Sequence, residues 1–241
     1  MATRIFEPQT CAADAELALG ERNVQHLIRA LRMDVGDYCV LFNGDGGEYD
    51  ARIVAAGKRE CIVRLGLRRE PATESPLVTH LGQVMSKGDR MEYAVQKAAE
   101  LGVHDITPLT SARCDIRLDD DRLEKKREHL QMVAVAACEQ SGRVRVPTVH
   151  APLALEKWTA KANAGLKLVL HPGDTTQSLP TQCLSAALLV GPEGGLTAEE
   201  IQTAQKHGFV ACTFGPRVLR TETAPAAALA VLQARYGDFR S

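Results

Sequence analysis

The sequence lacks several features that would assign the protein to a particular class. Only 4% of its 241 residues are aromatic, and its longest nearly apolar run, 224–232, is much shorter than the roughly 20 residues that cross a bilayer. Residues 1–7 contain no apolar signal core, so export by that route is not expected. The seven cysteines form no C-x-x-C pair, which predicts reduced thiols and a cytoplasmic location.

Metal-binding spacing and an excess of positive charge are also missing. The seven histidines show no H-E-x-x-H or related pattern, and no G-x-S-x-G elbow is present, so metal and serine-hydrolase chemistry are not predicted. The 29 Lys and Arg residues face 30 Asp and Glu residues, which gives a formal net charge of -1. Proteins that coat nucleic acid are usually basic. Binding to RNA would therefore require basic side chains gathered on one face.

A proline-framed segment, 71–76, separates two stretches with different patterns, and we place a domain boundary between residues 71 and 72. In the first domain, 1–71, apolar residues at helical spacing over 24–31 predict a short helix with Asn23 as its N-cap. Strand-like runs at 38–42, 48–55 and 61–65 follow, and we interpret the glycine-rich turn between the first two as a hairpin. This domain is predicted to be a small, mostly antiparallel β barrel that carries a helix.

In the second domain, 72–241, apolar strands alternate with helices. This alternation predicts an α/β fold with a mostly parallel sheet and helices on both faces. Strands are expected at 77–84, 103–107, 167–170, 186–190 and 210–214, and helices at 89–101, 120–141, 198–207 and from Thr223 onward.

Two loops follow predicted strands and carry more chemistry than connectors need. In the first, L-L-V-G-P-E-G-G-L-T (188–197), glycines allow close backbone approach, and Thr197 with Glu200 forms a capping box. It matches neither the dinucleotide fingerprint nor the phosphate-binding loop, and a tight turn without a ligand remains open. The second, F-G-P-R-V-L-R-T-E-T-A-P (214–225), contains Arg217 and Arg220. Each arginine could instead pair with Glu193 or Glu222, or face solvent.

Together these loops resemble the signature loops of the SPOUT methyltransferases, and more narrowly of the RsmE family, ribosomal RNA small subunit methyltransferase E. The resemblance extends to K-G-D-R-M-E (87–92), Q-K-A-A-E-L-G (96–102) and A-C-E-Q-S-G-R (137–143), and reaches 4–6 and 35–37 in the first domain. It covers essentially the whole chain in the same order.

The resemblance implies a PUA-like RNA-binding domain joined to a domain whose C-terminal part forms a deep trefoil knot. It implies a homodimer that uses S-adenosylmethionine (SAM) to methylate N3 of one uridine of 16S rRNA in the small ribosomal subunit, with no metal and no membrane. Three strand-end loops, 170–172, 190–195 and 214–224, would form the cofactor pocket. The residues implied for it are Leu170, His171, Pro172, Val190, Gly191, Pro192, Glu193, Gly194, Gly195, Phe214, Gly215, Arg217, Val218, Leu219, Thr223 and Ala224.

The chemistry of such a transfer suggests roles for individual residues. Uridine N3 becomes nucleophilic only after it loses its proton, and a fixed guanidinium would stabilise the charge that then spreads to O2 and O4. We assign this role to Arg220, with Arg143 as the second choice. No residue stands out as the general base: Glu139 and Glu222 are possible, although both are better suited to hold arginines in place.

RNA contacts are expected from local basic clusters, namely Arg4, Arg22, Arg29 and Arg32 in the first domain, and Arg143 and Arg145 after the long helix. A solvated helix face is the alternative for the first group. Cys138, which lies among alanines, is interpreted as a core thiol rather than a nucleophile. Two other functions remain open: a SPOUT methyltransferase that acts on another RNA, and a knotted RNA-binding protein without catalysis.

Overall fold

The structure is a computed structural model that describes residues 2–114, 119–171 and 179–239. The chain divides into two compact units, the first formed by Met1–Glu74 with Cys138–Val146 and the second by Ser75–Ala137 with Pro147–Ser241. The sequence analysis placed 138–146 in the second domain. These residues group with the first unit because Cys138 and Val144 pack against Phe42. None of the helices in the described part of the chain is long and apolar enough to span a membrane.

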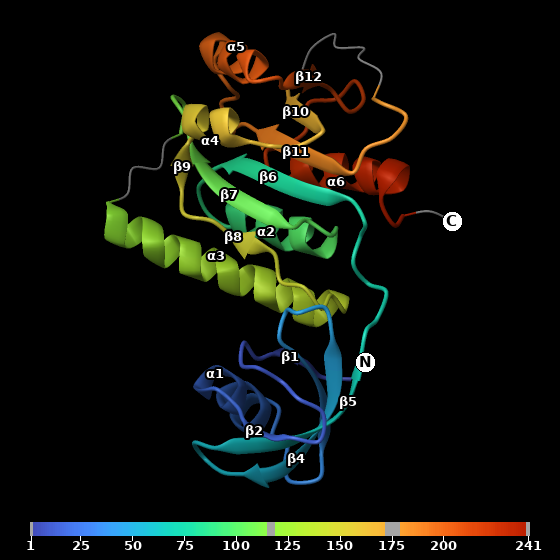
Figure 1. Cartoon of the computed structure of the whole chain (residues 1–241). Helices are drawn as coiled ribbons and strands as arrows, with labels where there is room; N and C mark the ends of the chain where they lie inside the picture. The colour runs from blue at the N-terminus through green and yellow to red at the C-terminus, as the bar shows by residue number, and fades with distance from the viewer. Residues whose placement is uncertain (1, 115–118, 172–178, 240–241) are drawn as a thin grey trace. The chain divides into compact units, whose positions relative to one another are not determined.

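The first unit is built on a five-stranded sheet with the order β1-β3-β4-β5-β2 (Figure 1). The β1–β3 pair is parallel and the other three pairs are antiparallel. Its core contains Ile5, Leu27, Leu41 and Ile53, all fully buried. The elements are β1 (Arg4–Phe6), β2 (Glu16–Ala18), α1 (Glu21–Val24), the π-helical segment η1 (Gln25–Ala30), β3 (Tyr38–Phe42), β4 (Glu48–Ala56) and β5 (Cys61–Arg69).

The predicted N-cap of the first helix is wrong. The helix begins at Glu21, with Gly20 at the N-cap position and no side-chain cap. Asn23 lies inside the helix and is buried, and its amide donates to the Phe6 carbonyl (2.8 Å) and to Glu7 Oε2 (3.0 Å). Because the buried Glu7 carboxylate needs donors, Asn23 serves a tertiary contact instead of a cap.

The second unit contains a seven-stranded sheet with the order β12-β10-β11-β6-β7-β8, with β9 also paired to β7. All of its pairs are parallel. Its elements are β6 (Val78–Val84), α2 (Arg90–Glu100), β7 (Asp105–Thr110), α3 (Asp120–Ser141), β8 (Thr148–Val149), β9 (Leu153–Ala154), α4 (Leu155–Lys161), β10 (Leu166–Leu170), β11 (Ser185–Val190), α5 (Ala198–Lys206), β12 (Val210–Cys212) and α6 (Thr223–Tyr236).

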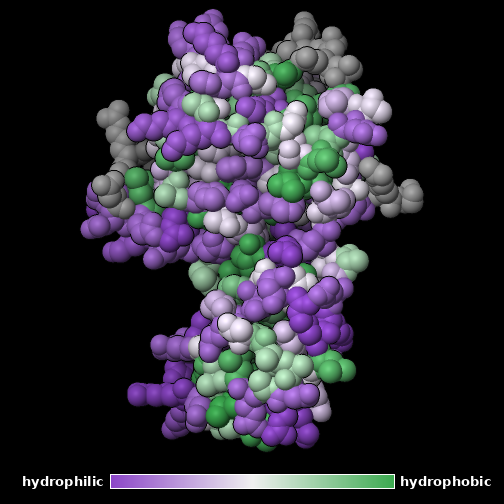
Figure 2. All heavy atoms as spheres, in the orientation of Figure 1, coloured by the Kyte–Doolittle hydropathy of each residue, from purple (hydrophilic) through white to green (hydrophobic). Residues whose placement is uncertain are grey.

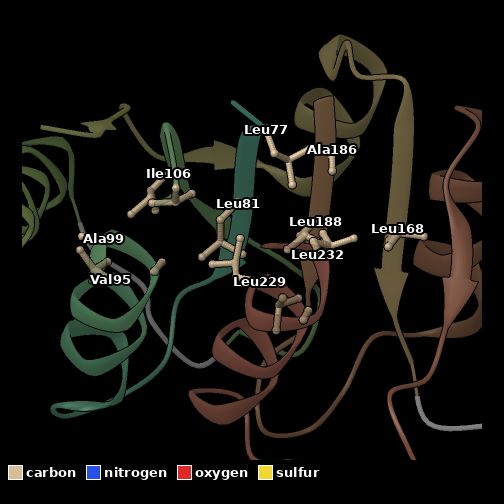
Figure 3. Packing of buried hydrophobic residues seen from close by; sticks show 14 of the residues in the cluster. Leu77, Leu81, Val95, Ala99, Ile106, Leu168, Ala186, Leu188, Leu229 and Leu232 are labelled. Atoms are coloured by element: carbon tan, nitrogen blue, oxygen red, sulfur yellow. The ribbon is translucent and has the colours of Figure 1, made fainter. Parts of the chain in front are cut away.

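Alternate residues of the central strands enter two separate cores. Leu188 on β11 and Leu81 on β6 pack with side chains from α2, α3 and α6, as Figure 3 shows in part. Leu189 and Val84 face the opposite side, where Trp158 of α4 and Ala204 of α5 lie. Helices therefore cover both faces of the sheet (Figure 1), which confirms the predicted α/β class.

The long helix 120–141 and the capping box of Thr197 with Glu200 are confirmed. In contrast, β1, β2, β8, β9 and α4 were not predicted. On the face that Figure 2 shows, hydrophilic residues predominate over both units, with hydrophobic residues interspersed among them.

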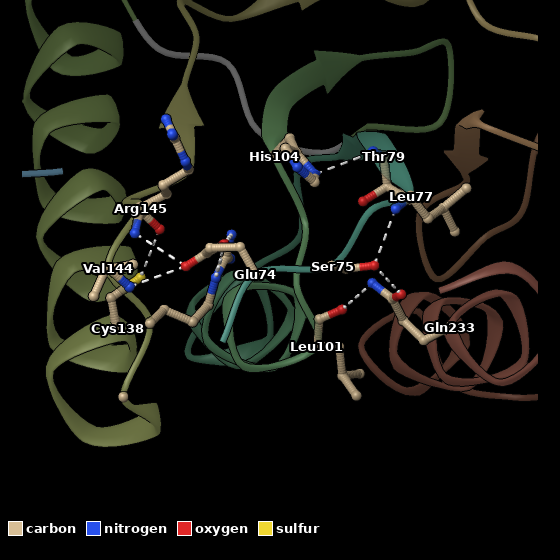
Figure 4. Close-up of polar contacts among 12 residues, drawn as sticks. Glu74, Ser75, Leu77, Thr79, Leu101, His104, Cys138, Val144, Arg145 and Gln233 are labelled. Atoms are coloured by element: carbon tan, nitrogen blue, oxygen red, sulfur yellow. Dashed lines mark hydrogen bonds and ion pairs between the residues drawn. The ribbon is translucent and has the colours of Figure 1, made fainter. Parts of the chain in front are cut away.

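The end of the predicted linker is bound rather than solvated. Ser75 is 6% exposed. Its hydroxyl lies 2.6 Å from Gln233 Oε1, and the Gln233 amide donates to the Leu101 carbonyl at 2.9 Å (Figure 4). These bonds hold the start of the second unit against α6.

Candidate functional site

Three parallel strands of the second unit end side by side. In the sheet register, Leu170 at the end of β10 pairs with Val190 at the end of β11 and with Cys212 at the end of β12. The loops that follow these strands therefore begin at the same level of one sheet edge. Ligands of parallel α/β sheets bind at this edge.

The three loops surround a cavity of about 440 Å³. This size lies within the range of about 300–1,000 Å³ that is usual for small-molecule sites. Apolar side chains, backbone, two arginines of the last loop and two carboxylates all contribute to it. The lining residues are Arg90, Leu170, His171, Val190, Gly191, Pro192, Glu193, Gly195, Leu196, Cys212, Thr213, Phe214, Arg217, Val218, Leu219, Arg220, Thr221, Glu222 and Ala224.

Buried hydrogen bonds hold the loops together beneath the cavity. The Thr221 hydroxyl donates to the Gly191 carbonyl at 2.7 Å and accepts from the Gln83 side-chain amide at 3.0 Å. Gly191 also has a steric role, because a Cβ there would lie 2.9 Å from Leu196 Cγ. The glycine thus permits the loop after β11 to fold closely on itself.

The charged side chains on the lining differ in their hydrogen bonds and in their exposure. Glu193 accepts from Arg90 at 2.5 Å, and this hydrogen bond raises the pKa of Arg90. The Arg220 side chain is 80% exposed, and its Nη1 lies 4.0 Å from Glu222 Oε1. The Glu222 side chain is only 15% exposed. Its Oε2 is buried and has no hydrogen-bond partner among the described residues.

Most residues that the sequence analysis assigned to a cofactor lie on this lining, but four do not. Gly194 lines a neighbouring cavity instead, and Gly215 and Thr223 line neither of the two. Pro172 lies outside the described residues. Four lining residues were missed: Arg90, Leu196, Cys212 and Thr213. Thr221 and Glu222 lie on the lining and inside the predicted segment 214–224, although Glu222 was singled out only as a base or as an arginine partner.

Arg143, the second choice for catalysis, is not on the cavity lining. It belongs to the first unit, where it is 3% exposed. Its Nη2 donates to Glu74 Oε2 at 2.8 Å, while Glu74 Oε1 accepts the backbone N–H groups of Val144 and Arg145 (Figure 4). The guanidinium therefore secures residues 143–145 within the first unit.

The basic residues predicted to bind RNA fall into two groups. Arg4 is ion-paired with Glu48 and is largely buried, and Arg22 donates to both oxygens of Glu139 at 3.0 and 2.8 Å. Glu139 thus holds an arginine, as the sequence analysis favoured. The other group, Arg29, Arg32 and Arg145, is exposed.

Two other sequence interpretations concern reactive groups. Cys138 is fully buried, and burial raises the pKa of its thiol to about 12, so the interpretation as a core thiol is confirmed. Within the described ranges, no group of three or more His, Cys, Asp or Glu side chains is arranged to hold a metal ion.

Comparison with known protein families gives two matches. Residues 73–233 match the family described as the RNA methyltransferase domain, and residues 19–66 match the RNA methyltransferase PUA domain. Together they extend over both units of the chain.

Relatives and solved structures resemble the chain along most of its length. It is 32% identical to ribosomal RNA small subunit methyltransferase E of Buchnera aphidicola subsp. Schizaphis graminum, over 98% of this chain and 97% of the relative. The Bacillus subtilis protein of the same name is also 32% identical, over 87% and 86%. The Neisseria gonorrhoeae enzyme of that name, solved with bound S-adenosyl methionine, has a TM-score of 0.94 and 34% identity, with full coverage of both chains.

A Legionella pneumophila structure with the cofactor SAM bound has a TM-score of 0.96 at 42% identity, over 99% of this chain and 100% of the other. The sequence identity, the two domain matches and the shared fold agree. The chain therefore belongs to the family of ribosomal RNA small subunit methyltransferase E, the family that its signature loops resemble.

Proposed function

We propose that this protein is a SAM-dependent methyltransferase that modifies N3 of a single uridine, uridine 1498, of 16S rRNA. The observation that carries the proposal is the register of Leu170, Val190 and Cys212, which gathers both signature loops around one cavity. Relatives of this family have been solved with the same cofactor bound, which supports the choice of methyl donor.

The residues of the cavity fit this cofactor. Leu170, Val190 and Leu219 offer apolar surface for the purine, and the glycine-containing loop 191–195 exposes backbone groups that would bind its polar edges. The ammonium and sulfonium groups of the cofactor are positive, and Glu193 places a carboxylate on the same lining. When bound, the cofactor supplies an electrophilic methyl group, so the protein's main task is to position the acceptor.

We assign Arg220 to the uracil ring. Its guanidinium reaches the cavity and is largely exposed, so it is accessible to an incoming nucleotide. Loss of the N3 proton leaves negative charge on O2 and O4, and a guanidinium can donate to such oxygens with fixed geometry. Arg143 is dropped from the catalytic assignment because it is already committed to Glu74.

We assign Glu222 as the acceptor of the N3 proton. It is the carboxylate on the lining with an oxygen that is buried and unpaired in the described structure, whereas Glu193 already accepts from Arg90. A buried carboxylate oxygen without a donor is costly unless a ligand or a proton satisfies it. Uptake of the N3 proton of uridine by this carboxylate would relieve that cost.

The proposal includes three further features. The first unit, which carries the PUA-domain match, contributes exposed basic residues to RNA binding, with Arg29, Arg32 and Arg145 as the candidates. The chain segment after β12 forms the trefoil knot, and two copies of the chain form a homodimer. The family resemblance supports both of these features.

Analysis of the product tests the function. In a strain that lacks this gene, nucleoside mass spectrometry of 16S rRNA should lose 3-methyluridine, and restoring the gene should return it. Because N3 lies on the Watson–Crick edge, primer extension should also stop opposite the modified base in wild-type rRNA only. An unchanged nucleoside profile would reject the reaction. Calorimetric binding of SAM without any modified nucleoside in 16S rRNA would point to another RNA substrate.

A further inference from the structure

The first unit contains a hollow of about 610 Å³ between the end of η1 and the turn that joins β4 to β5. It lies within the segment that matches the PUA domain, 19–66. Its lining combines partly buried apolar side chains with exposed cations. The apolar ones are Ile28, Met33 and Ala56, and the cations are Arg29, Arg32 and Lys58. A ligand of this hollow would therefore contact apolar surface and positive charge together.

The apolar part of the hollow belongs to the edge of the first unit's core. Ile28, Met33 and Ala56 pack against that core and keep part of their surface exposed. Apolar surface gathered in a hollow is typical of ligand sites, because a ligand that covers it removes it from water. A flat ring such as a nucleobase would cover it.

Arg32 has a backbone conformation that arginine rarely adopts. Its φ is +57°, and Asp14 is the other described residue besides the glycines with a positive φ. Arg32 directly follows Leu31, the C-cap residue of η1, at the position where glycine is favoured. The turn through Arg32 lets the Met33 N–H donate to the Leu27 carbonyl at 3.0 Å. An arginine kept at such a strained position points to a function of its side chain.

The cations of the hollow differ in what they bind. Arg29 donates to the Lys58 carbonyl at 3.2 Å, which joins the end of η1 to the turn between β4 and β5. The side chains of Arg32 and Lys58 form no ion pair or hydrogen bond with other residues that the structure describes. Asp34, the carboxylate on the lining, accepts the N–H of its neighbour Val35 at 2.7 Å. The guanidinium of Arg32 and the ammonium of Lys58 can both bind an anionic group.

We propose that this hollow binds one unpaired nucleotide of the rRNA, with its base on Ile28 and Met33 and its phosphate at Arg32 and Lys58. The proposal rests on the proposed function, from which it takes the RNA substrate. Single-stranded RNA presents unstacked bases beside phosphates, and proteins bind such bases by stacking, including on arginine. An acidic peptide would use the cations but leave the apolar surface uncovered, so the nucleotide fits the whole lining better.

The strained position provides a variant that separates binding from stability. Arg32→Gly removes the guanidinium and suits the left-handed backbone, so the urea midpoint of unfolding should rise. Asp14→Gly, at the other left-handed position, is the matched control for strain. Arg52→Gln removes an exposed arginine of the same unit that does not line the hollow, and is the control for charge. Binding of the full-length proteins to a 16S rRNA transcript is measured over a series of KCl concentrations, and binding to SAM by calorimetry.

A second comparison asks whether a base enters the hollow. The probes are a short oligouridylate RNA and an abasic strand of the same length and charge. Met33→Gln keeps the length of the side chain but replaces its apolar surface with an amide. We expect the wild type to bind the oligouridylate several-fold more tightly than the abasic strand, and Arg32→Gly and Met33→Gln to lose most of this preference.

We expect Arg32→Gly to bind the transcript several-fold more weakly than the wild type and to bind SAM equally well. The slope of log affinity against log salt should fall by about 0.7 for one phosphate of a single strand that is no longer neutralised. Neither Asp14→Gly nor Arg52→Gln should weaken RNA binding to this extent. A lower urea midpoint for Arg32→Gly would overturn the functional role of the strained arginine, and an equal loss in Arg52→Gln would show that only net charge matters.

Two further outcomes would reject a nucleotide as the ligand. One is a preference for the base that survives unchanged in Met33→Gln. The other is a glutamate-rich peptide that displaces the oligouridylate from the wild type but not from Arg32→Gly, which would assign the hollow to a protein segment. If the strand binds as expected but the wild type transfers no methyl group to 16S rRNA, it is the proposed function that fails.

Discussion

The hydroxyl of Thr221 donates to the carbonyl of Gly191 at 2.7 Å, and this bond joins the two signature loops across the chain. Thr221 is 7% exposed and also accepts from Gln83. One side chain therefore sets the distance between the loop after β11 and the loop after β12. The shape of the cavity between the loops depends on this distance.

Replacing Thr221 with valine should weaken cofactor binding. The change keeps the volume but removes the donor to the Gly191 carbonyl, and it leaves the Gln83 amide with the Val84 carbonyl as its acceptor. Each buried polar group left unpaired costs about 1–3 kcal/mol. We expect SAM affinity to fall by about tenfold or more, which corresponds to about 1.4 kcal/mol, as measured by calorimetry. Thr221→Ser keeps the hydroxyl and should bind nearly as well as the wild type. Equal binding by the valine variant would show that the loops hold their distance without this bond.

Local signals in the sequence were sufficient for much of the fold. Gly142, with a φ of +83°, ends α3 where glycine is favoured, and the box of Thr197 with Glu200 begins α5. The short strand β1 was missed because its partner, β3, lies more than thirty residues away in the sequence. Three residues carry too little periodicity to predict a strand alone.

The candidate site likewise has some features that local sequence predicts and others that depend on the tertiary structure. Glycines and prolines identify strand-end loops locally, so both signature loops that line the cavity could be found from the sequence. Whether an arginine side chain can bind a ligand depends on the tertiary structure. Arg143 is ion-paired with Glu74, and Arg4 is ion-paired with Glu48. Lys87 and Arg113 share a cavity only because β6 and β7 are neighbours, and strand order cannot be read from composition or periodicity.

Arg220→Ala should separate chemistry from cofactor binding. Its guanidinium is largely exposed and is assigned to the uracil oxygens, so SAM affinity should stay nearly intact. The loss of one donor to a developing oxyanion typically reduces kcat by about 10²–10³. Single-turnover methylation of the rRNA and calorimetry with SAM give the two quantities. Equal losses of both would reassign Arg220 to the cofactor pocket.

Glu222→Gln should preserve the side-chain shape and remove the proton acceptor. If Glu222 deprotonates N3, kcat should fall by about 10²–10⁴ while SAM binding changes little. The rate of the variant should also rise more steeply with pH, because activity then depends on uridine ionised in solution. A variant that keeps the wild-type rate, or one that loses SAM affinity in proportion to its rate, would contradict the assignment as the base.

Reversing charge at two exposed arginines tests the first unit. Arg29 and Arg32 line a hollow of about 610 Å³ together with Lys58. Arg29→Glu with Arg32→Glu should weaken binding to 16S rRNA and flatten its salt dependence, because favourable interactions with phosphates are replaced by repulsion. Lys157→Glu with Lys161→Glu, on α4, makes the same change of net charge and should have a smaller effect. Equal effects of the two pairs would mean that only net charge matters.

The stability of the protein should depend on His80. Its Nε2 accepts from Trp158 Nε1 at 3.2 Å and lies 2.8 Å from the Thr107 hydroxyl, an arrangement that requires the neutral ring. Burial lowers the pKa of His80 from 6.5 to about 4, with Asp105 opposing the shift and His150 adding to it. Between these values the unfolded chain takes up a proton that the folded chain does not. The free energy of unfolding should therefore fall as the pH decreases from about 6.5 to about 4, by up to about 3 kcal/mol from this group.

Urea unfolding of the wild type and of His80→Gln over this pH range measures the contribution. The variant should be less stable at neutral pH, since glutamine does not reproduce the ring packing against Trp158, but its stability should change less with pH. His207→Gln removes an exposed histidine of the same unit and should leave the wild-type pH dependence unaltered. If His80→Gln kept the full pH dependence, a group other than His80 would have to titrate between these values.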